Sequence, residues 1–119
     1  VTEAMRKVQV PFGVSTVAQV AAIASLEHED ELLERVATIV AERGRVEDGL
    51  RAAGLHPAHS EANFVWLRLG ERTGSFAAAC DEAGLSVRPF GDEGLRITIG
   101  EPEANTRLIE VAARWSQQA

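Results

Sequence analysis

The stretch from Glu93 to Asn105, with the sequence EGLRITIGEPEAN, constrains the fold of this chain more than any other. Apolar and polar residues alternate from Leu95 to Ile99, which is typical of a β-strand with one buried face. Gly100 is expected to end the strand, and Pro102 is a residue that is favoured in the first turn of a helix. The stretch therefore predicts a strand that passes directly into a helix.

Alternation along this strand places an arginine on rigid backbone, opposite an apolar face. Successive side chains of a strand point to opposite faces, so Arg96 and Thr98 share one face and the apolar residues share the other. A guanidinium group is a planar fork of donors that matches a carboxylate or a phosphate. Arg96 is therefore a candidate anion-binding residue. The alternative interpretation is that Arg96 lies on the solvated face of a half-covered sheet.

The periodicity of the whole chain predicts one α/β domain, residues 1–119, with elements in the order α-α-α-β-α-β-β-α. The helices are expected at residues 2–8, 16–26, 29–53, 73–83 and 102–115, and the strands at 63–69, 85–90 and 95–99. Thr16 and Gln19 form a candidate capping box. Residues 91–94 predict a hairpin between the second and third strands. If the third strand lies between the other two, the strand order is 1-3-2, with helices packed on the sheet.

Two arginines are expected to share one face of that sheet. Arg88 alternates with apolar neighbours in the second strand, and the strand order brings it beside Arg96. Phe64 and Trp66 of the first strand are in phase with each other, so one or two aromatic rings could join the arginines in a site for an anionic or aromatic small molecule. The favoured interpretation of these two rings is nevertheless the hydrophobic core, because the long helix must pack against the sheet.

The composition argues against several classes of function. The formal net charge of −6 argues against a nucleic-acid-binding surface, since phosphate contacts need clustered Lys and Arg. A single cysteine, Cys80, rules out a disulfide framework, and no cluster completes a metal site around His56 and His59. No apolar run is long enough for a membrane span and no signal peptide is recognised at Val1, so the expected location is the cytoplasm.

No motif of a self-contained catalytic centre is found in the sequence. The loop patterns that bind dinucleotides or nucleoside triphosphates, the nucleophile elbow and the zinc-peptidase helix are all missing. The acidic run from Glu27 to Glu31 is better explained by the positive end of the helix that follows it. The residues alone thus predict an α/β domain with two rigid arginines, no catalytic residue and no metal ligand.

Three segments together carry a resemblance to a known enzyme family: RKVQVPFGVSTVAQVAAIASLE (residues 6–27), SEANFVWLRLG (60–70) and GLSVRPFGDEGLRITIGEPEAN (84–105). They resemble the C-terminal part of a fold-type I aminotransferase that depends on pyridoxal phosphate. The resemblance is strongest to the histidinol-phosphate aminotransferase family, including its aromatic amino acid (phenylalanine) branch. It implies that the chain is the small domain of such an enzyme, and that a large domain holds the cofactor on a lysine.

The resemblance also implies roles for both arginines. Arg96 matches the arginine that holds the substrate's carboxylate, or the phosphate of histidinol phosphate, and Arg88 matches a second arginine at the same site. The substrate is then an aromatic amino acid or histidinol phosphate, with 2-oxoglutarate as the amino acceptor, and the parent enzyme is expected to be a homodimer. The catalytic lysine motif matches nothing here, and Lys7 is not that lysine. The chain alone is therefore expected to be inactive and not to bind pyridoxal phosphate tightly.

A second class of function stays open at this point: a stand-alone module that binds an anionic metabolite or a partner protein through the face of Arg88 and Arg96. The chain begins at Val1 without an initiator Met, on residues typical of the end of a helix, which suggests a fragment of a longer protein. The sequence does not distinguish histidinol phosphate from an aromatic amino acid as the substrate, nor does it explain the missing large domain.

Overall fold

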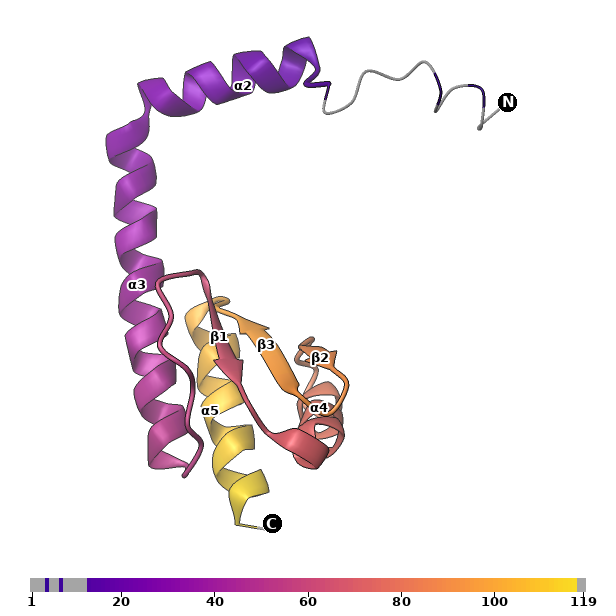
Figure 1. Ribbon diagram of the computed structural model, residues 1–119. Helices are drawn as coiled ribbons and strands as arrows, with labels where there is room; N and C mark the ends of the chain where they lie inside the picture. The colour runs from indigo at the N-terminus through magenta and orange to yellow at the C-terminus, as the bar shows by residue number, and fades with distance from the viewer. Residues whose placement is uncertain (1–3, 5–6, 8–12, 118–119) are drawn as a thin grey trace. The chain divides into compact units, whose positions relative to one another are not determined.

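The computed structural model describes residue 4, residue 7 and residues 13–117, which belong to two compact units, Val1–Arg35 and Val36–Ala119. In chain order the elements are α2 (Thr16–Glu27), α3 (Glu29–Ala52), β1 (Phe64–Leu67), the 3-10 helix η1 (Gly70–Arg72), α4 (Thr73–Glu82), β2 (Arg88–Phe90), β3 (Gly94–Thr98) and α5 (Pro102–Ser116) (Figure 1). The helix expected at residues 2–8 falls largely outside the described residues. Among the described helices, none combines the length and the apolar character that a membrane span requires. That residues 1–119 form a single domain stays a prediction.

The first unit contains α2 and the beginning of α3. Ser15, with extended backbone, caps α2, because its hydroxyl accepts a hydrogen bond from the backbone N–H of Ala18 at 3.2 Å. The expected capping box at Thr16 is therefore wrong by one residue, and the Gln19 side chain donates to the carbonyl of Val14 instead. None of the residues of α2 is buried, and its apolar side chains are spread around the helix rather than along one stripe.

The second unit is built on an antiparallel three-stranded sheet with the predicted order β1-β3-β2. β3 is the central strand, and Trp66 of β1 and Arg88 of β2 both lie opposite Arg96. Since both neighbours run antiparallel to β3, β1 and β2 are parallel, and the connection through α4 is the crossover that parallel strands require. The β2 strand is shorter than expected, because residues 85–87 do not pair with β3.

One face of the sheet carries the hydrophobic core. β1 contributes Val65 and Leu67, which are buried, as are the inward-facing residues of β3. The helices and the loop after α3 add Val46, Leu50, Leu55, Phe76, Cys80, Leu108, Val111, Ala112 and Trp115. Val65 and Leu67 thus occupy the face that was favoured for Phe64 and Trp66, whose side chains point the other way and are only half-buried. The expectation that these two rings belong to the core is wrong.

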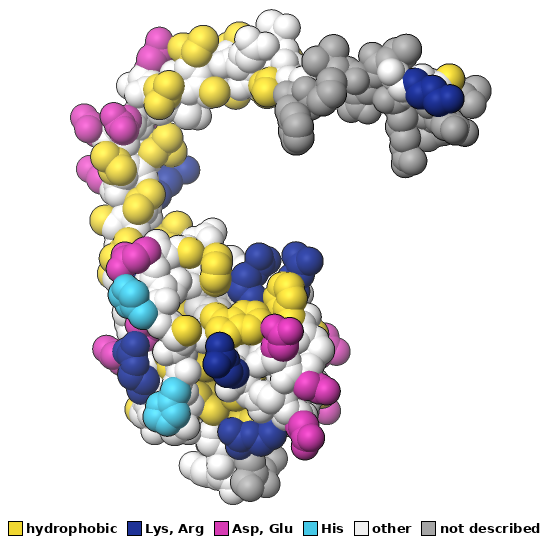
Figure 2. Space-filling model, in the orientation of Figure 1, with side chains coloured by type: hydrophobic (Ala, Val, Ile, Leu, Met, Phe, Trp, Pro, Cys, Tyr) yellow, Lys and Arg dark blue, Asp and Glu magenta, His cyan; other side chains and the backbone are white. Residues whose placement is uncertain are grey.

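The long helix α3 buries only its C-terminal part. The sequence predicts an apolar stripe along the whole helix, but its buried residues are Val46, Glu47 and Leu50. At Gly49 the side chain of Ile109 from α5 comes so close that an added Cβ would lie 2.7 Å from its carbons. Earlier apolar residues of the helix are exposed, namely Leu32, Leu33, Val36, Ile39 and Val40 (Figure 2). The fold therefore packs the end of α3 tightly and leaves apolar surface along its beginning.

Candidate functional site

The sheet face opposite the core carries the two arginines that the sequence singles out. Arg88 and Arg96 are directly opposite each other in the β2–β3 ladder, so their side chains leave the sheet on the same side. Arg88 is exposed and Arg96 is half-buried. Like charges in this arrangement repel each other, and an anion placed between them would relieve the repulsion. The predicted adjacency of the two arginines is confirmed, whereas their role in binding stays a prediction.

Aromatic rings hold both guanidinium groups. The guanidinium carbon of Arg96 lies 5.5 Å from the centre of the Phe64 ring, and that of Arg88 lies 5.2 Å from the centre of the Phe90 ring. Trp66 meets Phe90 edge to face, with 5.5 Å between the ring centres. Cation–π contacts orient a guanidinium group without using its N–H donors. The rings therefore hold the arginines of this face in place without occupying their N–H donors.

Arg96 has one donor that no described residue satisfies. Its Nε atom is buried and has no hydrogen-bond partner among the described residues. A buried donor without an acceptor costs about 1–3 kcal/mol, which makes such a position unusual unless a ligand completes it. A carboxylate is suited to this position, because its two oxygens match the fork that Nε and a terminal nitrogen of arginine present.

An open pocket of about 480 Å³ adjoins the ring of Trp66, and Trp66, Arg68, Gly70, Asp92 and Glu93 line it. Trp66 belongs both to this pocket and to the row that contains the two arginines. A glycine is needed beside it at position 94, because an added Cβ would overlap the carbonyl of Leu67 and lie 3.0 Å from Cζ2 of the Trp66 ring. The sheet face thus combines two cations and three aromatic rings, and it meets the pocket at Trp66.

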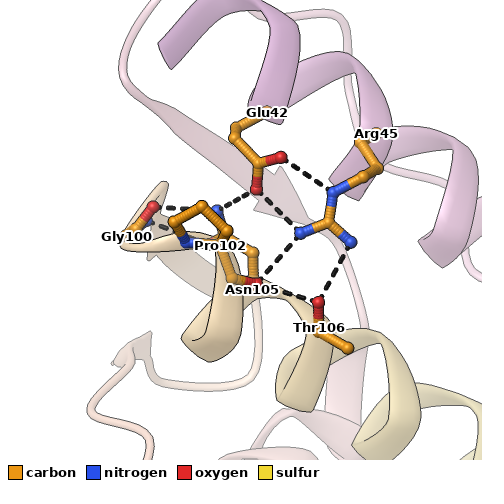
Figure 3. A network of polar contacts seen from close by, with 6 residues as sticks. All are labelled: Glu42, Arg45, Gly100, Pro102, Asn105 and Thr106. Atoms are coloured by element: carbon orange, nitrogen blue, oxygen red, sulfur yellow. Dashed lines mark hydrogen bonds and ion pairs between the residues drawn. The ribbon is translucent and has the colours of Figure 1, made fainter. Parts of the chain in front are cut away.

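A second polar cluster lies where β3 passes into α5 (Figure 3). The Asn105 side chain accepts a hydrogen bond from the N–H of Gly100 at 3.0 Å and donates to the carbonyl of Gly100 at 2.8 Å. It also donates to Oε2 of Glu42 at 2.8 Å. Arg45 donates to both oxygens of Glu42, each at 2.8 Å, and to the carbonyl of Pro102. The hydrogen bonds from Arg45 and Asn105 lower the pKa of Glu42 to about 2, so that Glu42 is ionised at neutral pH.

Sequence reasoning missed this second cluster. The sequence does contain one indication of it. Asn105 is a polar residue on the buried stripe of α5, whose other members are Leu108, Val111, Ala112 and Trp115. Buried polar side chains require hydrogen-bond partners, so a buried asparagine in the first turn of a helix indicates a contact with the preceding loop. The partners on α3 could not be found in the same way, because Glu42 and Arg45 look like any exposed charge pair of a helix.

The described residues offer no other reactive centre. Among them, no group of three or more His, Cys, Asp or Glu residues is placed to hold a metal ion. Cys80 is buried, and burial raises the pKa of its thiol to about 11, so it is not an activated nucleophile. The face of Arg88 and Arg96 is therefore the candidate site, and its cations and rings are chemically suited to an anion that carries an aromatic or other apolar group.

Comparison with known proteins places the chain in a family. Residues 1–111 match the family described as aminotransferase class I and II. Over 118 residues the chain is 57% identical to the aromatic amino acid aminotransferase of Streptomyces coelicolor and 53% identical to that of Thermobifida fusca. Both alignments include 99% of this chain and 33% of the relative, so the chain spans about a third of the length of these relatives.

A solved structure supports the same assignment. The histidinol-phosphate aminotransferase of Sinorhizobium meliloti, solved with pyridoxal 5'-phosphate, superimposes with a TM-score of 0.73 and 26% identity. The superposition covers 98% of this chain and 34% of that enzyme. The sequence match and the shared fold lead to one conclusion: this chain belongs to the aminotransferase class I and II family.

Proposed function

We propose that this chain is the substrate-binding small domain of an aminotransferase that depends on pyridoxal phosphate and acts on aromatic amino acids, with 2-oxoglutarate as the amino acceptor. Relatives named aromatic amino acid aminotransferase, at 57% and 53% identity, support this substrate class over histidinol phosphate. The rings of Phe64, Trp66 and Phe90 beside the two arginines support it as well, because an aromatic side chain can pack against them.

The proposal rests on the surroundings of the Arg96 side chain. Its guanidinium group is fixed over the Phe64 ring, its buried Nε lacks a partner among the described residues, and a second arginine lies directly opposite. In the proposal, Arg96 binds the carboxylate of the amino acid through two parallel hydrogen bonds. Arg88 supplies the second cation of the site and keeps the local charge positive, which favours substrates that carry a carboxylate.

The cofactor itself does not fit the described residues. The sheet face supplies arginines and aromatic rings but no lysine amine, and Lys7 is the only lysine in the sequence. Pyridoxal phosphate withdraws electrons from the α-carbon of a bound amino acid, and it is attached to its enzyme through a lysine. We therefore assign the cofactor to the rest of a longer polypeptide, and we expect the 119-residue chain alone not to transaminate.

The exposed apolar residues from Val14 to Val40 support a partner for this chain. The side chains of Val17 and Leu26 on α2 are 79% and 73% exposed, although a helix that is apolar around its circumference is normally buried. The chain also spans only a third of the length of its relatives. We propose that a large domain of the same polypeptide covers α2 and the first half of α3. A homodimer of the complete protein and a cytoplasmic location stay predictions.

The proposal is tested on the complete protein, meaning the full-length polypeptide of which this chain is proposed to be a part. Changing Arg96 to Ala should lower kcat/KM for phenylalanine by about 2–5 kcal/mol of transition-state binding, because a desolvated ion pair is lost. The visible absorption of the bound cofactor should not change. Arg107→Ala, which removes an exposed arginine of α5, is the matched control and should leave kcat/KM unaltered.

Two results would contradict the proposal in different ways. If Arg96→Ala and Arg107→Ala have the same kcat/KM as the unchanged protein, Arg96 does not bind the substrate. If the complete protein shows neither cofactor absorbance nor transamination, the enzyme assignment fails, and a non-catalytic anion-binding module takes its place.

A further inference from the structure

The backbone just beyond the strand that carries Arg96 is also held by hydrogen bonds. β3 ends at Thr98, and the N–H of Ile99 still donates to the carbonyl of Asn63 at 2.9 Å. At Gly100 the side-chain amide of Asn105 takes over, because it accepts from the N–H and donates to the carbonyl of the same residue. An amide that binds both backbone groups of one residue replaces the neighbouring strand at that point.

Glu42 fixes which way this amide faces. The Asn105 side chain is 3% exposed, and its remaining N–H points at Oε2 of Glu42. If the amide were turned over, its oxygen would face both the carboxylate and the Gly100 carbonyl, and all three hydrogen bonds would be lost. Glu42 is itself held, because Arg45 binds both of its oxygens. The chain of contacts therefore runs from α3 through one carboxylate and one amide to the end of β3 (Figure 3).

The position of Arg96 depends on the register of β3. A slip of one residue would turn every side chain of a strand to the other face and would carry Arg96 into the core. Both neighbouring strands are short, with four residues in β1 and three in β2, and all three residues of β2 are exposed. The contacts of Asn105 with Gly100 thus add a fixed point four residues beyond the arginine, on the same strand and its extension.

We propose that Asn105, oriented by Glu42, is a positioning residue for substrate binding: its amide holds the end of β3 so that Arg96 presents its guanidinium group to the substrate's carboxylate. This inference rests on the proposed function of Arg96. Asn105 touches neither the substrate nor Arg96 in this account. Its effect is on the affinity for carboxylates rather than on the chemical step, because the lysine and the cofactor lie elsewhere in the complete protein.

The test compares two variants of the complete protein that alter the same cluster. Asn105→Ala removes the amide, whereas Thr106→Val removes the neighbouring hydroxyl, which contacts Arg45 and Pro102 but not Gly100. The readouts are KM and kcat for phenylalanine, and Kd for 3-phenylpropionate, which has the carboxylate and the ring but no amine. Asn105→Ala should raise KM and Kd by roughly tenfold with kcat within about twofold, as expected for misplacement of a binding group.

Thr106→Val should leave both constants within about twofold of the unchanged protein. If Asn105→Ala also leaves them within about twofold, even though the protein has become less stable, Asn105 has a structural role only and the inference is overturned. A parallel Arg96→Lys variant separates the two proposals. An unchanged Kd in Arg96→Lys contradicts the proposed function, whereas a raised Kd there together with normal constants in Asn105→Ala contradicts this inference alone.

A double variant answers the question if Asn105→Ala does not fold. Combining Asn105→Asp with Glu42→Gln exchanges the amide and the carboxylate, so the two side chains can still bind each other and the N–H of Gly100 keeps its acceptor. The donor to the Gly100 carbonyl is lost, and so is the hydrogen bond from Nη2 of Arg45 to Oε2 of Glu42, whereas Nε of Arg45 keeps its acceptor. The inference predicts a folded protein whose Kd for 3-phenylpropionate is raised by roughly tenfold. A folded double variant with the Kd of the unchanged protein would overturn it.

Discussion

Glu42 makes the stability of the second unit depend on pH. The hydrogen bonds from Arg45, and next those from Asn105, lower its pKa from 4.5 to about 2. A carboxylate with a lowered pKa in the folded state stabilises the fold above its unfolded pKa, and this contribution is lost as the pH falls through the folded value. We expect the free energy of unfolding to decrease between pH 4.5 and about 2, and Glu42→Gln should remove this part of the decrease.

Urea unfolding of the 119-residue chain at a series of pH values measures this dependence. Other carboxyl groups titrate in the same range, so the informative quantity is the difference between the unchanged chain and Glu42→Gln. That difference should be constant above pH 5 or so and should shrink below it, since protonation of Glu42 weakens the same contacts. A difference that stays constant down to about pH 2 would show that Glu42 is not stabilised by its partners.

Cys80 gives a second prediction at the scale of one residue. The side chain is buried, and burial raises its pKa to about 11, so that at pH 8 it is protonated as well as inaccessible. A thiol reagent such as an aromatic disulfide should react with it only as fast as the second unit unfolds. The reaction rate should therefore rise with urea in parallel with the unfolded fraction. Fast labelling in the absence of urea would contradict the packing of α4 on the sheet.

The sequence predicted the positions of individual site residues only where strand alternation and strand order determine them. The alternation of β3 put Arg96 opposite an apolar face, and the strand order put Arg88 beside it, as the register shows. The contacts of Arg96 and Arg88 with Phe64 and Phe90 depend on rotamers and on the phase of β1, which periodicity does not determine. The contact of Asn105 with α3 could not be predicted, because Glu42 is 63 residues away in the sequence.

At the scale of elements, two glycines of α3 differ in what surrounds them. An added Cβ at Gly49 would lie 2.7 Å from the side chain of Ile109, whereas nothing lies within 4 Å at Gly44. Gly49→Ala should therefore destabilise the fold by about 1–2 kcal/mol, because the overlap outweighs the gain in helix propensity. Gly44→Ala, in the same helix, should stabilise it by about 0.5–1 kcal/mol. Urea unfolding of both variants tests the pair, and equal effects would contradict the close approach of α3 and α5.

The phase of β1 shows where element prediction from sequence fails. Every residue from Phe64 to Leu67 is apolar, so alternation gives no signal, and the need of the long helix to pack against the sheet favoured Phe64 and Trp66 as core. The structure puts the smaller residues, Val65 and Leu67, against the helices and leaves the rings for the site. Two of the rings on that face contact arginines, Phe64 with Arg96 and Phe90 with Arg88.

At the scale of the molecule, the order of elements and the strand order were predictable, because short connections leave few ways to arrange three strands around one crossover. The exposure of the apolar residues between positions 13 and 40 was not predictable. Periodicity predicted an apolar stripe on each of α2 and α3, but it does not say what covers these helices. The exposed residues from Val14 to Val40 are consistent with a proposed large domain, since the relatives are about three times as long.

The most direct test of the proposed function is the crystal structure of the complete protein with bound 3-phenylpropionate. We predict that its carboxylate lies in the fork of the Arg96 guanidinium group and accepts a hydrogen bond from Nε, with the ring near Trp66 and Phe90. The Nε atom, which lacks a partner among the residues that the structure describes, would then be satisfied. A carboxylate bound away from the face of Arg88 and Arg96, with Nε of Arg96 bonded to another part of the protein, would contradict the account.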